Sequence, residues 1–127
     1  MGVSTPAIPL QYEQAESNGA VIVRLSGELD VGFVEQLEQR FTKLLASRPK
    51  TVVVDLAGAQ MLSSVAMGAI LRLHTALRAT GGKMALVAVP AAVLAALRRA
   101  RIDLLIPVHP SVDAAVKSLV VAGGAHA

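Results

Sequence analysis

The sequence alternates between short runs rich in β-branched residues and longer segments with helical periodicity. The run 51–56, TVVVDL, is continuous and apolar, which is typical of a strand covered on both faces. In the segment 64–79 apolar residues recur at every fourth position from Val65 through Leu73 to Leu77, and two glycines follow its end. Buried strands separated by helices are typical of a parallel sheet, so this alternation predicts an α/β fold.

The chain before residue 51 predicts a hairpin and one helix. The segments 8–13 and 20–25 are β-rich, and Ser17, Asn18 and Gly19 between them include residues that tolerate a positive φ. An amphipathic stripe then predicts a helix over 31–47, which Pro49 ends. After the helix at 64–79, the expected elements are a strand at 83–89, a helix at 91–100, a strand at 106–109 and a final helix capped by Ser111. We therefore expect a mixed, mostly parallel sheet with an N-terminal hairpin.

The length of the chain, 127 residues, fits one domain of ordinary size. With 54% hydrophobic and 17% charged residues it carries enough apolar surface for a core. We expect an N-terminal extension at 1–7, the domain at 8–121 and a flexible tail at 122–127.

The sequence also limits the setting of the protein. It contains no cysteine, which excludes disulfides and thiolate metal ligands. The first ten residues lack the basic start and apolar stretch of a secretory signal. The longest apolar run without a charge, 56–71, is shorter than the roughly 20 residues that a membrane span needs. These features predict a cytoplasmic protein without a membrane segment.

Charge is unevenly distributed along the chain, whose net charge is +3. The stretch 56–102 holds no acidic residue but contains Arg72, Arg78, Lys83, Arg98, Arg99 and Arg101. No aromatic residues lie among these bases, and no nucleic-acid-binding motif is present. We therefore interpret them as solvated outer faces of helices and expect no direct contact with nucleic acid.

No enzyme motif survives comparison with this layout. Gly82 and Lys83 resemble the end of a phosphate-binding loop, but Ala76 stands in place of its first glycine and Met84 in place of its Ser or Thr. His74, His109 and His126 are too scattered for a metal cluster. A triad of Asp55, Ser64 and His74 fails because ten helical residues span about 15 Å. We expect no catalytic residue, no metal and no cofactor, and a protein that is not an enzyme.

Three segments resemble the STAS-domain family, to which bacterial anti-sigma-factor antagonists and the cytoplasmic tails of sulphate transporters belong. The segment 55–71, DLAGAQMLSSVAMGAIL, is similar to the family signature DLSGVxxIDSSGLGxLL. Upstream, 26–30 reads SGELD, and downstream 81–83 precedes an apolar strand as in the family. The resemblance extends over 8–119 and implies a small mixed sheet with about four helices packed mainly on one side.

The resemblance also implies a site at the start of the second predicted helix. In the family's antagonists a serine at this point is phosphorylated by a serine kinase, and the matching residue is Ser64, with Ser63 the second choice. A phosphate there would meet backbone N–H groups and the positive end of the helix dipole. The expected partner-binding residues are Asp30, Ser63, Ser64 and Met67. Ser63 stands where the family usually has Asp, and simple helix capping by either serine or by Asp30 is the competing interpretation.

The resemblance predicts a regulatory binding module. When unphosphorylated, it would bind an anti-sigma-factor serine kinase, which supplies ATP, and so free a sigma factor. A serine phosphatase would be a further partner, and homodimer formation is left open. The alternative is a constitutive STAS scaffold in a stress-signalling assembly or a lipid-transport ABC complex. A nucleotide-binding or catalytic protein is a third and weaker hypothesis.

Overall fold

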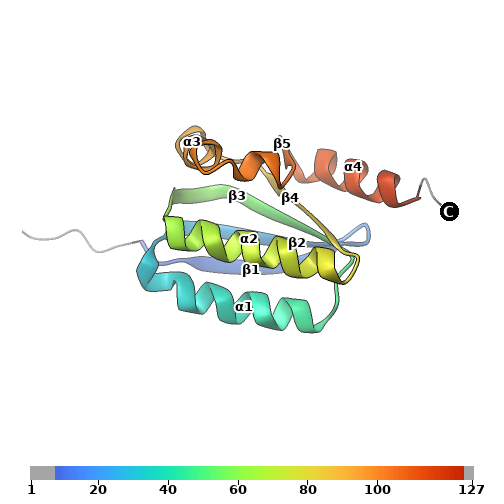
Figure 1. Cartoon of the computed structure of the whole chain (residues 1–127), viewed down its shortest axis with the longest axis horizontal. Helices are drawn as coiled ribbons and strands as arrows, with labels where there is room; N and C mark the ends of the chain where they lie inside the picture. Colours follow the sequence, from blue (N-terminus) through green and yellow to red (C-terminus); the bar gives the residue numbers. More distant parts are fainter. Residues whose placement is uncertain (1–7, 125–127) are drawn as a thin grey trace, which may run out of the picture.

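A five-stranded sheet organises residues 8–124, the part of the chain that the computed structural model describes (Figure 1). Its strands are β1 (Gln11–Ser17), β2 (Ala20–Leu29), β3 (Thr51–Leu62), β4 (Lys83–Val87) and β5 (Val108–His109), in that order across the sheet. The helices are α1 (Val34–Ala46), α2 (Ser64–Ala79), α3 (Ala91–Arg99) and α4 (Val112–Gly124), with short 3-10 turns η1 (Val31–Phe33) and η2 (Ile102–Leu104). Strands β1 and β2 are antiparallel and the other pairs parallel, which confirms the predicted α/β fold with a mixed sheet and N-terminal hairpin.

The hairpin turn forms where the sequence predicts it. Asn18 and Gly19 have φ values of 52° and 82°, the conformation that a two-residue hairpin turn requires. Strand β1 nevertheless lies at Gln11–Ser17 and not at 8–13. A two-residue turn lets pairing continue up to Ser17 and Ala20, and Pro9 has no N–H to give to a ladder. The turn therefore shifts the strand toward the C-terminus.

Strand β3 is the main difference from the predicted boundaries. It runs six residues past residue 56, to Leu62, although Ala57, Gly58 and Ala59 are poor strand formers. The extension exists because β2 also continues to Leu29 and pairs with it through two register irregularities. Gly27 lies at one of them with φ 85°, and a side chain there would collide with the carbonyl of Pro9. Tertiary pairing thus overrides local propensity here.

Smaller differences lie at other element ends. The predicted helix at 31–47 is a 3-10 turn followed by α1, β4 ends at Val87, and β5 has only two residues. Helix α2 has the predicted bounds. Helix α4 continues past residue 121 to Gly124, and residues 1–7 and 125–127 lie outside the described part of the chain.

Three helices bury side chains against one face of the sheet, and α4 packs on the other. Parallel strands added in one direction with right-handed crossovers place the connecting helices on one face. Helices α1, α2 and α3 accordingly share one core cluster, whereas α4 follows the last strand and covers the opposite face with a smaller cluster. Figure 1 shows α1 and α2 side by side on one side of the molecule and α4 on the other. The expectation of helices mainly on one side holds for three of the four.

The central strands alternate strictly between these two clusters. Val52 and Val54 face the larger cluster and Val53 the smaller one. On α2, Leu73 belongs to the larger cluster and is 2% exposed. Both faces of the central strands are therefore buried, as the continuous apolar run in β3 predicts.

Candidate functional site

Two loops meet where β2 and β3 end. Leu29 and Leu62 pair directly as the last residues of the two strands, and the backbone N–H of Ser63 donates to the carbonyl of Leu29 at 2.9 Å. Asp30 and Ser63 are therefore neighbouring chain positions just beyond the sheet, although they lie 33 positions apart in the sequence. The structure brings together the start of η1 and the start of α2, the two segments that carry most of the predicted site.

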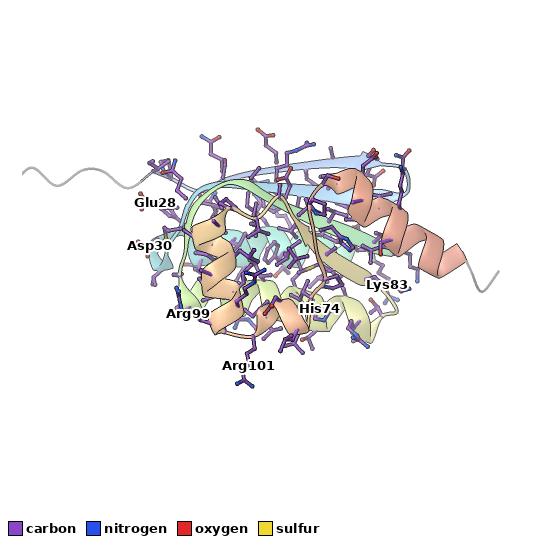
Figure 2. The ribbon with its side chains drawn as sticks, turned by 90° about the horizontal axis from the view of Figure 1, so that it is seen from above. Glu28, Asp30, His74, Lys83, Arg99 and Arg101 are labelled. Carbon is purple, nitrogen blue, oxygen red and sulfur yellow. The ribbon has the colours of Figure 1, made fainter. Side chains whose placement is uncertain are left out.

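Asp30 caps the turn that leads into α1. Its Oδ1 accepts a hydrogen bond from the N–H of Val31 at 2.7 Å, and its carbonyl accepts one from Phe33 at 2.9 Å. The side chain is half-buried. Figure 2 shows Asp30 at one end of the molecule beside Glu28, whose Oε1 accepts a hydrogen bond from the N–H of Ile8 at 3.3 Å. Asp30 is therefore both a helix cap and an acidic group at this end of the molecule.

The two adjacent serines have different structural roles. Ser63 is the N-cap of α2, and its Oγ accepts from the N–H of Ala66 at 3.1 Å. Ser64 is the first helical residue, its side chain is exposed, and its hydroxyl has no hydrogen-bond partner among the described residues. Of the two serines, only Ser63 thus stabilises the start of the helix through its side chain.

Met67 lies one turn further along α2. It is half-buried and packs against the larger core cluster, so only part of its side chain reaches the surface near Ser64. The structure therefore places all four predicted site residues at this end of the sheet, with Met67 the one most involved in the core.

Exposed apolar side chains surround the serines, and the sequence reasoning missed them. Val31, Met61 and Val65 are 59%, 36% and 46% exposed. The sequence pattern predicts Val65 in the buried stripe of α2, and this prediction is wrong. A repeat of four residues drifts by about 40° per turn in a helix of 3.6 residues per turn, so the stripe that ends at Leu77 no longer includes Val65. The residue turns outward at the helix start.

We call this surface the serine edge, and it consists of Asp30, Val31, Met61, Ser63, Ser64 and Val65. A depression of about 200 Å³ adjoins it, between the end of β3 at Met61 and helix α3 at Val93. An exposed group of apolar side chains beside a depression is typical of a protein-binding surface.

The electrostatics at the start of α2 are set by the helix itself. The first turn holds no acidic residue, and the N–H groups of Ser64 and Val65 are too early in the helix to reach a helical carbonyl. The first base along α2 is Arg72, which is paired with Glu38 of α1. An anion at Ser64 would therefore interact with backbone N–H groups and the helix dipole more than with a cationic side chain.

Two features are absent from residues 8–124. No group of three or more His, Asp or Glu side chains there is arranged to hold a metal ion. No helix in that range has both the length and the apolar character to cross a membrane.

Comparisons with known proteins agree with this arrangement. The family model of the STAS domain matches residues 11–115. An anti-sigma F factor antagonist from Paenibacillus polymyxa is 32% identical over 77 residues, which span 60% of this chain and 66% of that relative. The chain belongs to the STAS-domain family.

Solved structures with the same fold include several antagonists. An anti-sigma factor antagonist from Mycobacterium paratuberculosis has a TM-score of 0.82 and 25% identity, covering 92% of this chain and 98% of that one. The antagonist SpoIIAA in its unphosphorylated form has a TM-score of 0.72 and 20% identity, covering 86% and 94%. SpoIIAA from Bacillus in its phosphorylated form has a TM-score of 0.63 and 20% identity, covering 83% and 95%. Antagonists of this family are generally binding modules and not enzymes.

Proposed function

We propose that this protein is an anti-sigma-factor antagonist whose binding to a serine kinase is switched by phosphorylation of Ser64. The observation that carries the proposal is the exposed, unbonded hydroxyl of Ser64 among the apolar side chains of the serine edge. In the unphosphorylated state the protein binds the kinase, which is also the anti-sigma factor, and a sigma factor is released.

Docking through this surface gains free energy from burial of apolar area. Val31, Met61 and Val65 expose hydrocarbon that a partner would remove from water, at roughly 25 cal/mol per Å². Asp30 adds an acidic group at the rim, suited to a hydrogen-bond donor or a cation of the partner. A neutral hydroxyl at Ser64 is easily accommodated in such an interface.

A phosphate on Ser64 would change that balance. It adds about −1.5 to −2 charges in the middle of an otherwise apolar contact. The N–H groups at the start of α2 stabilise the anion, so the helix keeps its structure when modified. The partner, in contrast, would have to bury a charge where it met a hydroxyl. Phosphorylation therefore opposes docking without unfolding the antagonist.

Ser64 is a better acceptor than Ser63 for a geometric reason. A kinase needs an accessible hydroxyl, and Ser64 is exposed whereas Ser63 is half-buried and caps the helix. The phosphorylated form of SpoIIAA supports a switch of this kind, since it shares the fold of this chain. Reversal of the switch would require a serine phosphatase as a second partner.

The phosphorylation test uses the purified protein, ATP and a serine kinase of the anti-sigma-factor class. Intact-mass measurement should show addition of one phosphate, and peptide fragmentation should locate it at Ser64. Ser64→Ala should prevent labelling. Ser63→Ala, the matched control, should still be labelled although loss of the cap costs about 1 kcal/mol. Labelling that persists in Ser64→Ala and disappears in Ser63→Ala would assign the switch to the other serine.

The binding test compares acidic and neutral variants by calorimetry. We expect Ser64→Ala to bind the kinase like the wild type and Ser64→Glu to bind at least about tenfold more weakly, because only Glu brings charge into the contact. Ser118→Glu is the matched control, since Ser118 is exposed on α4, on the opposite face of the sheet. It should leave the affinity unchanged.

A constitutive scaffold is the second candidate. The exposed Val65 and the serine at position 63, in place of the family's usual Asp, favour a permanent apolar contact. Equal binding of wild type and Ser64→Glu, together with no labelling of Ser64, would favour this scaffold over the switch.

A further inference from the structure

A second site candidate lies away from the serine edge, beside the end of α2. An open cavity of about 420 Å³ is formed between this helix end, the start of β4 and the segment that follows η2. We call it the basic cavity, because its wall includes His74, Arg78 and Lys83. Its volume is in the range of small-molecule sites. Figure 2 shows His74 and Lys83 away from the end that carries Asp30.

The charged side chains in this wall are all basic. None of the residues that line the cavity is acidic. Within residues 8–124, neither Arg78 nor Lys83 has a carboxylate within ion-pair distance. Lys50 lines an adjoining depression that shares Lys83. Unpaired bases around a concave surface attract an anion.

The backbone contributes little to anion binding here. The N–H groups of Gly81, Gly82 and Lys83 donate to the carbonyls of Arg78, Leu77 and Lys50 at 3.1, 2.7 and 2.9 Å. Recognition of an anion in the basic cavity therefore depends on the side chains of Arg78 and Lys83.

The rest of the wall is apolar. Met84, Leu105, Pro107 and Leu119 line it. Leu105 is 55% exposed and its neighbour Leu104, outside the lining, is 76% exposed. Hydrocarbon of this size facing water at the mouth of a cavity favours an apolar ligand part. A ligand that satisfies both halves of the wall has an anionic head and a hydrocarbon chain.

His74 adds a polar side chain to this wall. The residue is 8% exposed, and its Nδ1 is enclosed without a hydrogen-bond partner among the described residues. Burial, aided by the charge of Arg78, lowers the pKa of His74, so the ring is neutral near pH 7. We place the proton on Nε2, the ring nitrogen that is not enclosed. The ring then offers the cavity a neutral donor.

We propose that the basic cavity binds an amphiphilic anion, with a carboxylate or phosphate head on Arg78 and Lys83 and an acyl chain along Leu105 and Pro107, the exposed apolar residues of the lining. His74 donates a hydrogen bond to the head group. This site is separate from the serine edge and does not depend on the function proposed for it.

The test uses decanoate at concentrations where it is monomeric, with the full chain labelled for NMR. Decanoate should shift the backbone amide signals of Gly81–Met84 and leave those of Ser63–Val65 unchanged. Acetate, which is the head alone, and decanol, which is the chain with a neutral head, should each bind at least about tenfold more weakly than decanoate. Decyl phosphate should bind as decanoate does. Decanol binding as tightly as decanoate would overturn the proposal.

Two pairs of variants test the assigned contacts. Arg78→Gln should weaken decanoate binding about tenfold, whereas Arg98→Gln removes an exposed charge outside the lining and should leave it unchanged. Leu105→Asp should abolish binding by placing a carboxylate in the mouth, and Leu104→Asp, one residue outside the lining, should retain it. Both leucines are exposed, so neither variant should unfold the protein.

A lipid surface is the other source of such a head group. Vesicles containing phosphatidylglycerol are therefore included as a separate arm. Binding to vesicles with no response to monomeric decanoate would overturn the cavity proposal in favour of attraction to a charged surface. Equal effects within each variant pair would overturn it as well.

Discussion

At the start of α2, one hydrogen bond gives two adjacent serines different structural roles. Ser63 and Ser64 are chemically identical and adjacent, so either fits a capping role by sequence. The bond from the N–H of Ala66 to Ser63 Oγ assigns the cap to the first serine. This leaves the hydroxyl of Ser64 on the surface, where a modifying enzyme could reach it.

His74 shows the reverse situation, a polar residue that sequence patterns treated as isolated. It lies on the buried side of α2 beside Leu73 and Leu77 because its helical position falls in the apolar stripe. Burial of an imidazole disfavours its charged form, and so does the cation at Arg78, one turn later. Lys83, which carries the same positive charge as Arg78, also lines the cavity.

The lowered pKa of His74 predicts a loss of stability in acid. In the unfolded chain the group titrates near 6.5, whereas the folded protein takes up the proton only at lower pH. The free energy of unfolding should thus be constant above about pH 6.5 as far as His74 is concerned, decrease below it, and level off once the folded form is protonated as well. His74→Gln should lack this part of the decrease. Urea unfolding of both proteins from about pH 8 to pH 5 measures the difference, and parallel curves would contradict the prediction.

At the scale of elements, agreement between sequence and structure depends on what fixes each boundary. Helix α2 has the predicted bounds because its cap, its periodicity and the glycines after it all lie in local sequence. Strand β3 is twice as long as predicted because its second half is held by pairing with β2. Strand β5 has two residues because only they pair with β4. Local patterns cannot specify boundaries that a distant strand determines.

The buried stripe of α2 gives a stability prediction for the element. Leu73 is 2% exposed in the larger core cluster, and truncation of such a leucine leaves a cavity. Leu73→Ala should lower the free energy of unfolding by about 2 to 5 kcal/mol. Thr75→Ala, on the exposed side of the same helix, should change it by less than about 0.5 kcal/mol. Denaturant titration distinguishes them, and equal losses for both variants would mean that the stripe is misassigned.

At the scale of the whole molecule, the sequence could indicate one of the two candidate sites but not the other. Motif resemblance located Asp30 and Ser64 because both belong to continuous segments of the family pattern. The basic cavity combines His74 from α2, Lys83 from β4 and Leu105 from a loop. The spacing of these three residues in the sequence does not predict that they meet, because crossover connections of the sheet bring them together. The exposure of Val65 at the serine edge was missed for a different reason, the drift of a four-residue repeat around the helix.

The two candidate sites lie toward opposite ends of α2, and this separation predicts their independence. Ser64 and Arg78 are the first and fifteenth residues of the helix, so about 21 Å of helix axis separates them. The Debye length at physiological ionic strength is about 8 Å, which screens a charge at one site from the other. Ser64→Glu should therefore change the affinity for decanoate by less than about twofold. By reciprocity, saturating decanoate should leave kinase binding unchanged to the same extent.

Calorimetric titration in both directions tests this independence. Ser118→Glu serves again as the charge-matched control, because it adds a negative charge on α4 away from the serine edge. A change of about tenfold or more in both directions, absent from this control, would contradict independence. It would mean that α2 moves as one rigid body between two positions, since a packed helix transmits displacement where screened charge does not. Under the proposed function, the protein would then respond to a small molecule as well as to phosphorylation.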